Sequence, residues 1–339
     1  MVGIDIGSKT IKIVDLERQG DSFSLIASGV VGYSGVTVDK MADEKEISSL
    51  SQIVKKLYSE AHVSSKEVVL SIPEPLAFTR TIKFPPLTDS EISSAIKWEA
   101  EQYIPIPINE AIIQHSVLKR GSGVGADAGV TVLLVAAPRA IVEKYVKVVQ
   151  SAGLTPVVVE TELIALTRSL APTDKTVVLV NLGSSSTNLA IVNNGLLSFS
   201  RSLPVAGEAF TRSVAQTLSI VPQQAEEYKK TYGLSTSQLE GKVKAALNPV
   251  IRLVTDEIKK AVNYYLSEEK GEAPSTLILS GGSSGMPEII TELSKSLGYE
   301  VLLGNSFSKV RVNSSIMQKL SPFAPLYGVA VGLAMHESV

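Results

Sequence analysis

The sequence contains no cysteine. This absence excludes a disulfide scaffold, a thiolate nucleophile and a cysteine-ligated zinc or iron–sulfur site. An excess of charge is also lacking, because 32 Lys and Arg residues stand against 34 Asp and Glu residues, for a formal net charge of −2. No overall positive field therefore favours nucleic acid or anionic lipid, and we do not expect a basic nucleic-acid binder.

Long apolar runs are missing as well. The longest, residues 324–335, has about half of the ~20 residues that a membrane-spanning helix needs, and Gly328 and Gly332 interrupt it. The N-terminus enters a strand pattern at once, without the basic start and apolar core of a signal peptide. We therefore expect a cytoplasmic protein.

A strand–turn–strand pattern occurs twice in the chain. Residues 2–15 contain two short strands around a turn at residues 7–10, and residues 176–192 repeat this pattern. Placing Asn181 on Asp5 aligns Gly183 with Gly7, an offset of 176 residues. This offset is too long for a solenoid repeat, and 339 residues allow two domains. The sequence predicts two related α/β lobes.

Residues 74–160 differ from the flanking sequence, with proline-marked turns between short strands and helices, and this pattern indicates an inserted subdomain. Strands are expected at 78–82, 112–118 and 130–137, together with two helices. Thr88 and Glu91 predict a capping box at the start of the first helix. On this helix, Trp98 and Tyr103 either pack in the core or offer a surface for contact with another protein.

The second half of the chain is mostly helical between its strands. The helical period and the proline and glycine positions predict these elements: helices 206–217, 222–231, 239–268 and 287–297, a strand at 276–279, a glycine turn at 281–285 and a terminal helix after Pro322.

Three turns, at residues 5–10, 181–187 and 280–285, each follow an apolar strand and combine glycine with hydroxyl side chains. Glycine lets the backbone approach an anion and direct several amides at it, while hydroxyls and the amines of Lys9 or Lys12 add donors and charge. Asp5, at a strand end, could hold Mg²⁺ through water. One such turn alone indicates only a hairpin, but three of them favour a nucleotide.

Other nucleotide and hydrolase motifs fit poorly. A Walker A loop needs Gly before Lys and a helix after it, whereas Ser8 precedes Lys9 and a strand follows. No G-x-G-x-x-G follows the first strand. Residues 281–285 satisfy G-x-S-x-G, but the hydrolase alternative would have to recruit His336, three residues from the chain end.

With these turns in this order, the whole chain resembles the actin, Hsp70 and sugar-kinase ATPase superfamily. The resemblance implies two phosphate loops, an adenosine loop at 279–285, and Glu226 and Lys229 near the ribose and the adenine. It implies ATP and Mg²⁺ as cofactors, with Asp5 as the metal residue. The implied nucleotide-binding residues are Asp5, Gly7, Ser8, Lys9, Thr10, Lys12, Asn181, Gly183, Ser184, Ser185, Ser186, Thr187, Glu226, Lys229, Gly281, Gly282 and Ser283.

Four segments, at 68–74, 96–107, 133–138 and 152–156, are similar to the PilM family, the actin-like cytoplasmic components of type IV pilus assembly. The resemblance implies an actin-like two-lobed fold with the inserted 1C subdomain found in FtsA. It implies a scaffold at the inner face of the cytoplasmic membrane that binds the cytoplasmic N-terminal segment of PilN. The pilus motor ATPase and platform proteins are further implied partners, and self-association is possible.

The resemblance also implies domain boundaries. The first lobe would span residues 1–160, with subdomain 1A at 1–73 plus a C-terminal helix at 322–339 and subdomain 1C at 74–160. The second lobe, with subdomains 2A and 2B, would span residues 161–321.

Asn181 departs from the superfamily, which commonly has Asp at this position. An amide brings no negative charge to Mg²⁺ or to a water molecule, and one such loss costs roughly 2–4 kcal/mol of catalysis. We therefore expect ATP to be bound with slow or no hydrolysis. A catalytically active ATPase or sugar-kinase-like phosphotransferase is the alternative, and the mostly apolar insert favours the scaffold.

Overall fold

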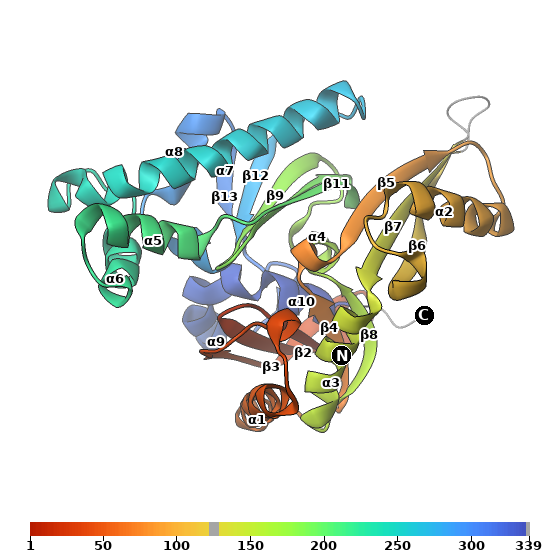
Figure 1. The fold of residues 1–339 in the computed structure, drawn as a ribbon, viewed down its shortest axis with the longest axis horizontal. Coiled ribbons are helices and arrows are strands. Elements are labelled where there is room, and N and C mark those ends of the chain that lie inside the picture. The colour runs from red at the N-terminus through yellow and green to blue at the C-terminus, as the bar shows by residue number, and fades with distance from the viewer. Residues whose placement is uncertain (122–128, 337–339) are drawn as a thin grey trace.

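The strands of the protein form three separate sheets. The computed structural model describes residues 1–121 and 129–336, and within these the sheets have six, five and three strands. Figure 1 shows the five-stranded sheet above the six-stranded sheet, with the three-stranded sheet standing at the right. The protein is therefore an α/β protein with two large sheets and one smaller one.

The six-stranded sheet has the order β14-β3-β2-β1-β4-β8. Its strand β1 pairs antiparallel with β2 and parallel with β4. All five residues of β1 are buried, as expected for a short apolar strand that is covered on both faces. The six strands are β1 (Val2–Ile6), β2 (Thr10–Gln19), β3 (Ser22–Gly32), β4 (Glu67–Ile72), β8 (Thr155–Thr161) and β14 (Val310–Arg311).

The five-stranded sheet repeats the central pairing of the first. Its β9 pairs antiparallel with β10 and parallel with β12. In both hairpins a residue near the end of the first strand faces the residue seven positions later, Asp5 facing Lys12 and Asn181 facing Asn188. The predicted repetition is confirmed. The strands, in the order β11-β10-β9-β12-β13, are β9 (Thr176–Leu182), β10 (Thr187–Asn193), β11 (Leu196–Leu203), β12 (Thr276–Ser280) and β13 (Glu300–Leu303).

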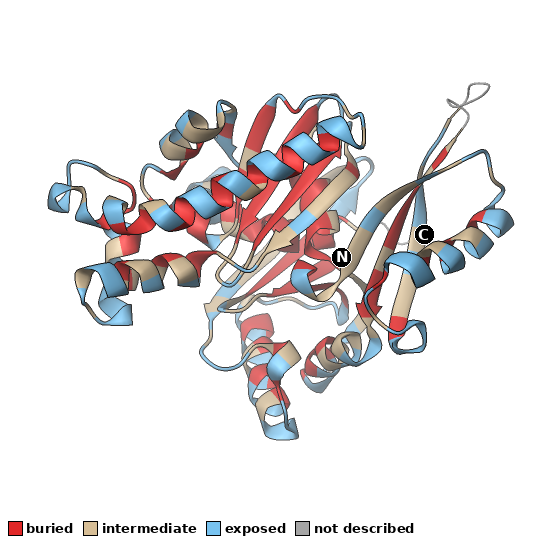
Figure 2. Ribbon diagram, turned by 45° about the horizontal axis from the view of Figure 1, so that its top comes forward, coloured by how far each residue is buried: buried red, intermediate tan, exposed pale blue. Residues whose placement is uncertain are grey.

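Two helices lie between the large sheets. Helix α4 (Glu162–Leu170) contacts the five-stranded sheet, α10 (Gly328–Ala334) contacts β1, β2 and β4, and the two helices contact each other. Figure 2 shows buried residues in red along the strands of both sheets. The expected terminal helix is the pair η7 (Ser321–Tyr327) and α10, and residues 337–339 lie outside the described part of the chain.

The remaining helices cover the outer faces of the sheets. Side chains of α1 (Glu44–Glu60) and α3 (Arg139–Ser151) share a core with β1, β2 and β4, and those of α7 (Lys242–Ser267) share a core with β9, β10 and β12. The other helices and short 3₁₀ turns are α5 (Gly207–Leu218), α6 (Pro222–Tyr232), α8 (Ile289–Leu297), α9 (Ser314–Leu320), η1 (Val38–Lys40), η2 (Glu74–Leu76), η3 (Ile108–Glu110), η5 (Leu239–Gly241) and η6 (Gly282–Gly285).

The three-stranded sheet and one helix form the insert. Its strands β5 (Phe78–Phe84), β6 (Ala111–Arg120) and β7 (Val130–Pro138) have the order β5-β7-β6. Helix α2 (Asp89–Tyr103) buries its apolar residues against β7 in a core of their own. The predicted capping box is present, since Thr88 accepts from the Glu91 amide and Glu91 accepts from the Thr88 amide.

The insert is shorter than the expected residues 74–160. Strand β8 pairs with β4, and α3 packs on α1, so residues 139–161 belong with the six-stranded sheet. Strand β14 also pairs with β3, so the chain returns to this sheet by residue 310 rather than 322. We propose residues 78–138 as the insert, and we propose that the second lobe ends before residue 310.

Trp98 and Tyr103 do not form a packed pair in the core. Trp98 is 72% exposed and Tyr103 is 40% exposed. The Arg80 guanidinium lies 3.8 Å from the centre of the Tyr103 ring, a cation–π contact at the surface. The core interpretation is therefore wrong for Trp98, and this face of α2 presents aromatic surface to solvent.

A helix that crosses a bilayer must be both long and apolar. Across residues 1–121 and 129–336, no helix is both long enough and apolar enough to cross a membrane.

Glycines allow α10 to touch its neighbours at the backbone. A Cβ on Gly332 would lie 1.8 Å from the carbonyl oxygen of Ala165 in α4, and a Cβ on Gly3 in β1 would lie 2.3 Å from the carbonyl oxygen of Ala330. No side chain fits at either distance. The contact between α4, α10 and β1 thus requires glycine at these positions.

We expect Gly332→Ala to lower the free energy of unfolding by about 1–3 kcal/mol or more, because α10 must move away from α4. Urea titration followed by circular dichroism measures this change. Gly285→Ala is the control, since a Cβ there meets no atom within 4 Å. Equal stability of the wild type and Gly332→Ala would contradict the close contact.

Candidate functional site

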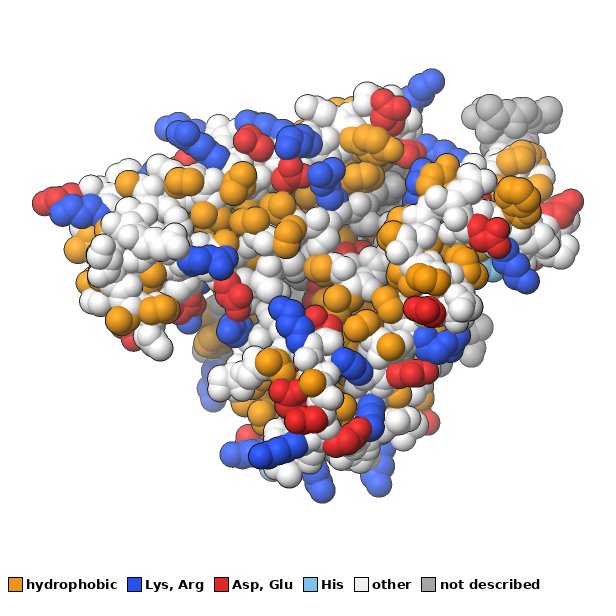
Figure 3. All heavy atoms as spheres, in the orientation of Figure 1, with side chains coloured by type: hydrophobic (Ala, Val, Ile, Leu, Met, Phe, Trp, Pro, Cys, Tyr) orange, Lys and Arg blue, Asp and Glu red, His pale blue; other side chains and the backbone are white. Residues whose placement is uncertain are grey.

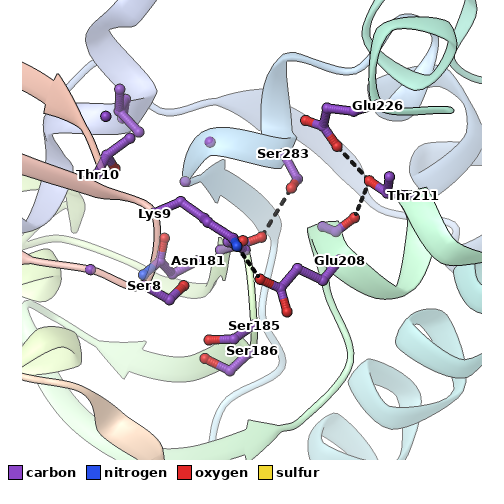
Figure 4. A pocket seen from close by; sticks show the side chains of 18 of the residues that line it. Ser8, Lys9, Thr10, Asn181, Ser185, Ser186, Glu208, Thr211, Glu226 and Ser283 are labelled. Atoms are coloured by element: carbon purple, nitrogen blue, oxygen red, sulfur yellow. Dashed lines mark hydrogen bonds and ion pairs between the residues drawn. The ribbon is translucent and has the colours of Figure 1, made fainter. Parts of the chain in front are cut away.

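A large cleft lies where β1 and β9 end. Its volume is about 1730 Å³, above the ~300–1,000 Å³ of common small-ligand pockets. Figure 3 shows the molecule hollowed between its upper and lower parts, and Figure 4 shows the side chains that meet there. The turns that follow β1, β9 and β12 all line this cleft.

The structure brings together all but one of the residues expected to bind nucleotide. The cleft is lined by Asp5, Gly7, Ser8, Lys9, Thr10, Lys12, Asn181, Gly183, Ser184, Ser185, Ser186, Glu226, Lys229, Gly281, Gly282 and Ser283. Thr187 is the exception, because it is buried in β10 and its hydroxyl donates to the Val205 carbonyl at 2.6 Å. Thr187 therefore stabilises the turn at residues 183–186 from the buried side of β10.

The first two turns have the same backbone geometry. The Gly7 amide donates to the Thr10 carbonyl, and the Gly183 amide donates to the Ser186 carbonyl, each at 3.0 Å. Among the described residues, no backbone carbonyl accepts from the two amides after each glycine, at positions 8–9 and 184–185. Unpaired amides in a glycine turn are suited to an anion such as phosphate.

Lys12 lines the cleft as expected, but its amine already has a partner. It is buried, and its Nζ donates to Asp5 Oδ2 at 2.9 Å. Ser71 Oγ donates to the other oxygen of Asp5 at 3.2 Å. Lys12 thus neutralises the Asp5 carboxylate in the lobe interior, and Lys9 is the exposed amine of this turn.

Lys9 reaches across the cleft to the second lobe. Its Nζ lies 3.1 Å from Glu208 Oε1, at the start of α5, and both side chains are about half exposed (55% and 50%). Figure 4 shows the two side chains pointing toward each other. An exposed ion pair of this kind contributes only about 0–1 kcal/mol, so an incoming phosphate can compete for Lys9.

The third turn is tied to the second. Ser283 Oγ donates to the Gly183 carbonyl at 2.9 Å. Gly281 has φ +92°, and a Cβ there would lie 2.5 Å from the Leu182 carbonyl oxygen, so only glycine fits between the strands. The turns after β9 and β12 therefore move as one unit.

A polar network forms the α5 and α6 side of the cleft. Lys229 is buried, and its Nζ donates to Glu226 at 2.6 Å, to Thr211 at 3.0 Å and to the Gly207 carbonyl at 3.2 Å. Burial lowers the pKa of Lys229, although Glu226 partly offsets this effect. Burial opposes the charge on Glu226, but hydrogen bonds from Lys229 and Thr211 outweigh burial and lower its pKa. Glu226 therefore carries an anionic acceptor at the cleft wall.

Two buried carboxyl groups in this region were not anticipated. Glu162, at the start of α4, lines the cleft and accepts from Asn188 Nδ2 at 2.8 Å. Burial, with the nearby Asp5 and Glu74 carboxylates, raises the pKa of Glu162 to about 8. Burial also raises the pKa of Glu74, which accepts from the Leu163 amide. No sequence motif marks Glu162, and Glu74 was noted only as the end of the segment at residues 68–74.

Tyr33 was also not anticipated. It lies just after β3, lines the cleft, and its hydroxyl donates to the Gly7 carbonyl at 2.6 Å. Burial, followed by the nearby Asp5 and Asp39 charges, raises the pKa of Tyr33 to about 12. The neutral phenol thus holds the first turn in place.

The residues of the cleft could bind a magnesium ion only if the ion kept most of its water ligands. Among the described residues, no group of three or more Asp, Glu and His side chains could hold a metal. Mg²⁺ commonly keeps most of its waters and uses one or two carboxylates, so Asp5 with the phosphates of a ligand would suffice. The metal role of Asp5 stays a prediction.

The hydrolase alternative has no histidine. Within the described ranges, no histidine lines the cleft, and His336 lies 3.8 Å from Glu160, at the end of α10. A serine nucleophile needs a base within hydrogen-bond reach. Ser283 therefore has no histidine in the cleft to activate it as a nucleophile.

Comparison with known proteins gives one family across the chain. Residues 3–338 match the family described as "Type IV pilus assembly protein PilM". A solved "PilM-PilN type IV pilus biogenesis complex" aligns with a TM-score of 0.84 and 26% identity, covering 98% of this chain and 97% of that one. The predicted family resemblance is confirmed.

More distant relatives agree on the fold. The cell division protein FtsA of Bacillus subtilis is 23% identical over 380 residues, covering 98% of this chain and 82% of FtsA. MreB5 of Spiroplasma citri, solved bound to ADP, aligns with a TM-score of 0.52 and 14% identity, covering 98% of this chain and 94% of MreB5. The predicted actin-like α/β fold is confirmed.

The pKa of Glu162 gives a stability test. The folded protein keeps this proton up to about pH 8, whereas the ordinary glutamate pKa is 4.5, so the folded state binds more protons between these values. Stability therefore falls as pH rises through this window. Glu162→Gln removes the titration, and we expect its advantage over the wild type to grow from pH 5 to pH 9 by on the order of a few kcal/mol.

Urea unfolding at several pH values, without nucleotide and with a chelator, measures this difference. Glu208→Gln is the matched control, because Glu208 is a half-exposed carboxyl on the same cleft. A constant difference between Glu162→Gln and the wild type from pH 5 to pH 9 would refute the raised pKa.

Proposed function

The chain belongs to the type IV pilus assembly protein PilM family, and from this premise we propose that it is an ATP-binding scaffold for PilN. It would bind the cytoplasmic N-terminal segment of PilN and link it to the pilus motor ATPase and platform proteins. We place it in the cytoplasm, at the inner face of the cytoplasmic membrane. The same scaffold could associate with further copies of itself.

The convergence of three glycine turns on one cleft carries this proposal. Two of them present unpaired amides from different lobes, at residues 8–9 and 184–185. A polyphosphate can accept hydrogen bonds from both sets at once, whereas either set alone offers a small anion site. A nucleoside triphosphate lying between the lobes fits this arrangement.

The other cleft residues fit the rest of ATP. Glu226 presents a carboxylate that can accept from ribose hydroxyl groups, and Lys229 lies beside it. The turn after β12 would close the adenosine side, since Gly281, Gly282, Ser283 and Gly285 line the cleft. When bound, Mg²⁺ would neutralise phosphate charge next to Asp5, and Lys9 would exchange Glu208 for phosphate.

The proposed binding of PilN is supported by the family of the chain and by the surface of the insert. The solved PilM–PilN complex aligns over nearly the whole chain, including the insert. The insert also presents aromatic surface at Trp98 and Tyr103. Exposed aromatic side chains are favoured in protein contacts, because a large apolar face can be buried with little loss of side-chain freedom.

A catalytic ATPase or phosphotransferase is the second candidate, and the position of Glu162 is the observation that suggests it. Its carboxyl lies in the cleft, where a base or water-positioning group would act. However, its raised pKa of about 8 keeps it largely protonated at neutral pH. Asn181 adds no negative charge, so both groups favour binding with slow turnover.

We expect a synthetic peptide of the PilN cytoplasmic N-terminal segment to bind the wild type more tightly with ATP and Mg²⁺ than without them. If ATP holds the lobes in the peptide-binding arrangement, the two ligands strengthen each other by about 5-fold to 150-fold. Isothermal titration calorimetry measures both affinities.

Gly183→Val provides the control, because a Cβ at this glycine would lie 2.9 Å from the Ser186 carbonyl oxygen and distort the turn. This variant should bind peptide equally with and without ATP. A wild type that binds no peptide would overturn the scaffold, and one that binds it equally in both conditions would overturn the coupling.

Phosphate release distinguishes the two candidate functions. We expect wild-type release from ATP to lie near background, and Asn181→Asp to raise it by roughly 30-fold to 1,000-fold, the range that one missing stabilising group costs. A coupled-enzyme phosphate assay measures both rates. Steady wild-type release that Asp5→Ala abolishes would instead support an active ATPase.

A further inference from the structure

An exposed aromatic side chain stands at the wall of the cleft. Phe323, in η7, is 54% exposed, although Ala324 and Pro325 beside it are buried. Phe323 lines the same cleft as Gly281 and Gly282. A single exposed apolar side chain is ordinary on a protein surface. A role for Phe323 therefore has to be argued from its position in the cleft and from the backbone that holds it.

The backbone next to Phe323 is fixed to the third glycine turn. The Pro325 carbonyl accepts from Ser280 Oγ at 2.7 Å and from the Gly281 amide at 2.9 Å. The Ala324 carbonyl accepts from Ser306 Oγ at 2.6 Å. The two peptide units after Phe323 are thus held by buried hydrogen bonds, and the ring is carried by a rigid support.

The 3₁₀ geometry directs Phe323 toward this turn. Side chains three residues apart lie on the same side of a 3₁₀ helix, so Phe323 shares a side with Leu326. Leu326 Cδ1 lies 3.5 Å from the position that a Cβ of Gly282 would take. Phe323 therefore lies on the face of η7 that meets the glycine turn. Because Gly281 and Gly282 have no side chains, they leave space beside the ring.

We propose that Phe323 stacks on the purine base of the bound nucleotide and sets a preference for purine over pyrimidine nucleotides. This inference rests on the proposed ATP binding. Aromatic rings stack on the planar faces of bases, and a purine offers a larger face than a pyrimidine. Phe323 is a specificity residue in this assignment, and the phosphates are held elsewhere.

Replacing the ring in the full chain tests the assignment. We expect Phe323→Ala to weaken ATP and ADP binding by about 5-fold to 100-fold, the effect of losing one stacked base, and to leave inorganic tripolyphosphate binding unchanged. The wild-type preference for ATP over CTP should shrink in this variant. Calorimetric titration with the four ligands measures these affinities.

Two further variants separate stacking from a structural role. Phe323→Tyr should retain ATP affinity, because it keeps an aromatic face, whereas Phe323→Leu should lose it despite its apolar bulk. Tyr264→Ala is the matched control, since Tyr264 in α7 is an exposed aromatic residue outside the cleft. Its ATP affinity should equal that of the wild type.

Unchanged ATP affinity in Phe323→Ala would overturn the stacking assignment while leaving the proposed function intact. Parallel loss of ATP and tripolyphosphate binding would also overturn it, because the ring would then only support the cleft. A wild type that binds tripolyphosphate but neither ATP nor ADP would overturn the proposed function together with this inference.

Discussion

The contact between α10 and α4 determines how the two large sheets meet. Gly332 brings α10 against the Ala165 carbonyl, and Gly3 brings β1 against α10 from the other side. With both helices packed between the sheets, the ends of β1 and β9 lie on one cleft. A bulkier helix pair would separate the turns, and the two sets of unpaired amides would no longer face one cleft.

The same junction concentrates buried charge, which has a cost unless each group is satisfied. Lys12 neutralises Asp5 in the first lobe, whereas Glu162 has Asn188 and the Glu74 amide as its polar partners. Glu162 therefore avoids the cost by holding a proton. The cleft thus has one ion pair, between Asp5 and Lys12, and one protonated carboxyl, Glu162. A cation bound nearby would lower the pKa of Glu162 and favour its charged form.

Local patterns predicted the elements that depend on neighbouring residues, and long-range contacts decided the rest. The two hairpins, the capping box at Thr88 and the glycine turns follow from nearby sequence. Strand β8 joins the first sheet by pairing with β4, which lies far from it in the sequence. Local patterns do not reveal this pairing, and the expected insert of residues 74–160 therefore includes β8. Glu162 belongs to no motif, and its place in the cleft depends on the packing of α4. Trp98 lies off the apolar face that Ile92 and Ile96 share, and it faces solvent.

The insert also touches the second lobe on β11. Thr81 in β5 donates to the Leu197 carbonyl at 3.0 Å, and Ser200 in β11 donates to the Thr79 carbonyl at 3.3 Å. Lys83 extends this contact to Glu269, beyond α7. The insert also packs on both lobes, since Leu133 in β7 shares a core with β4, α4 and β9. A change in the angle between the lobes must therefore move or break these contacts. Under the proposed function, a partner bound at the insert and a nucleotide bound in the cleft would act on the same lobe arrangement, and each would favour the other without sharing a contact.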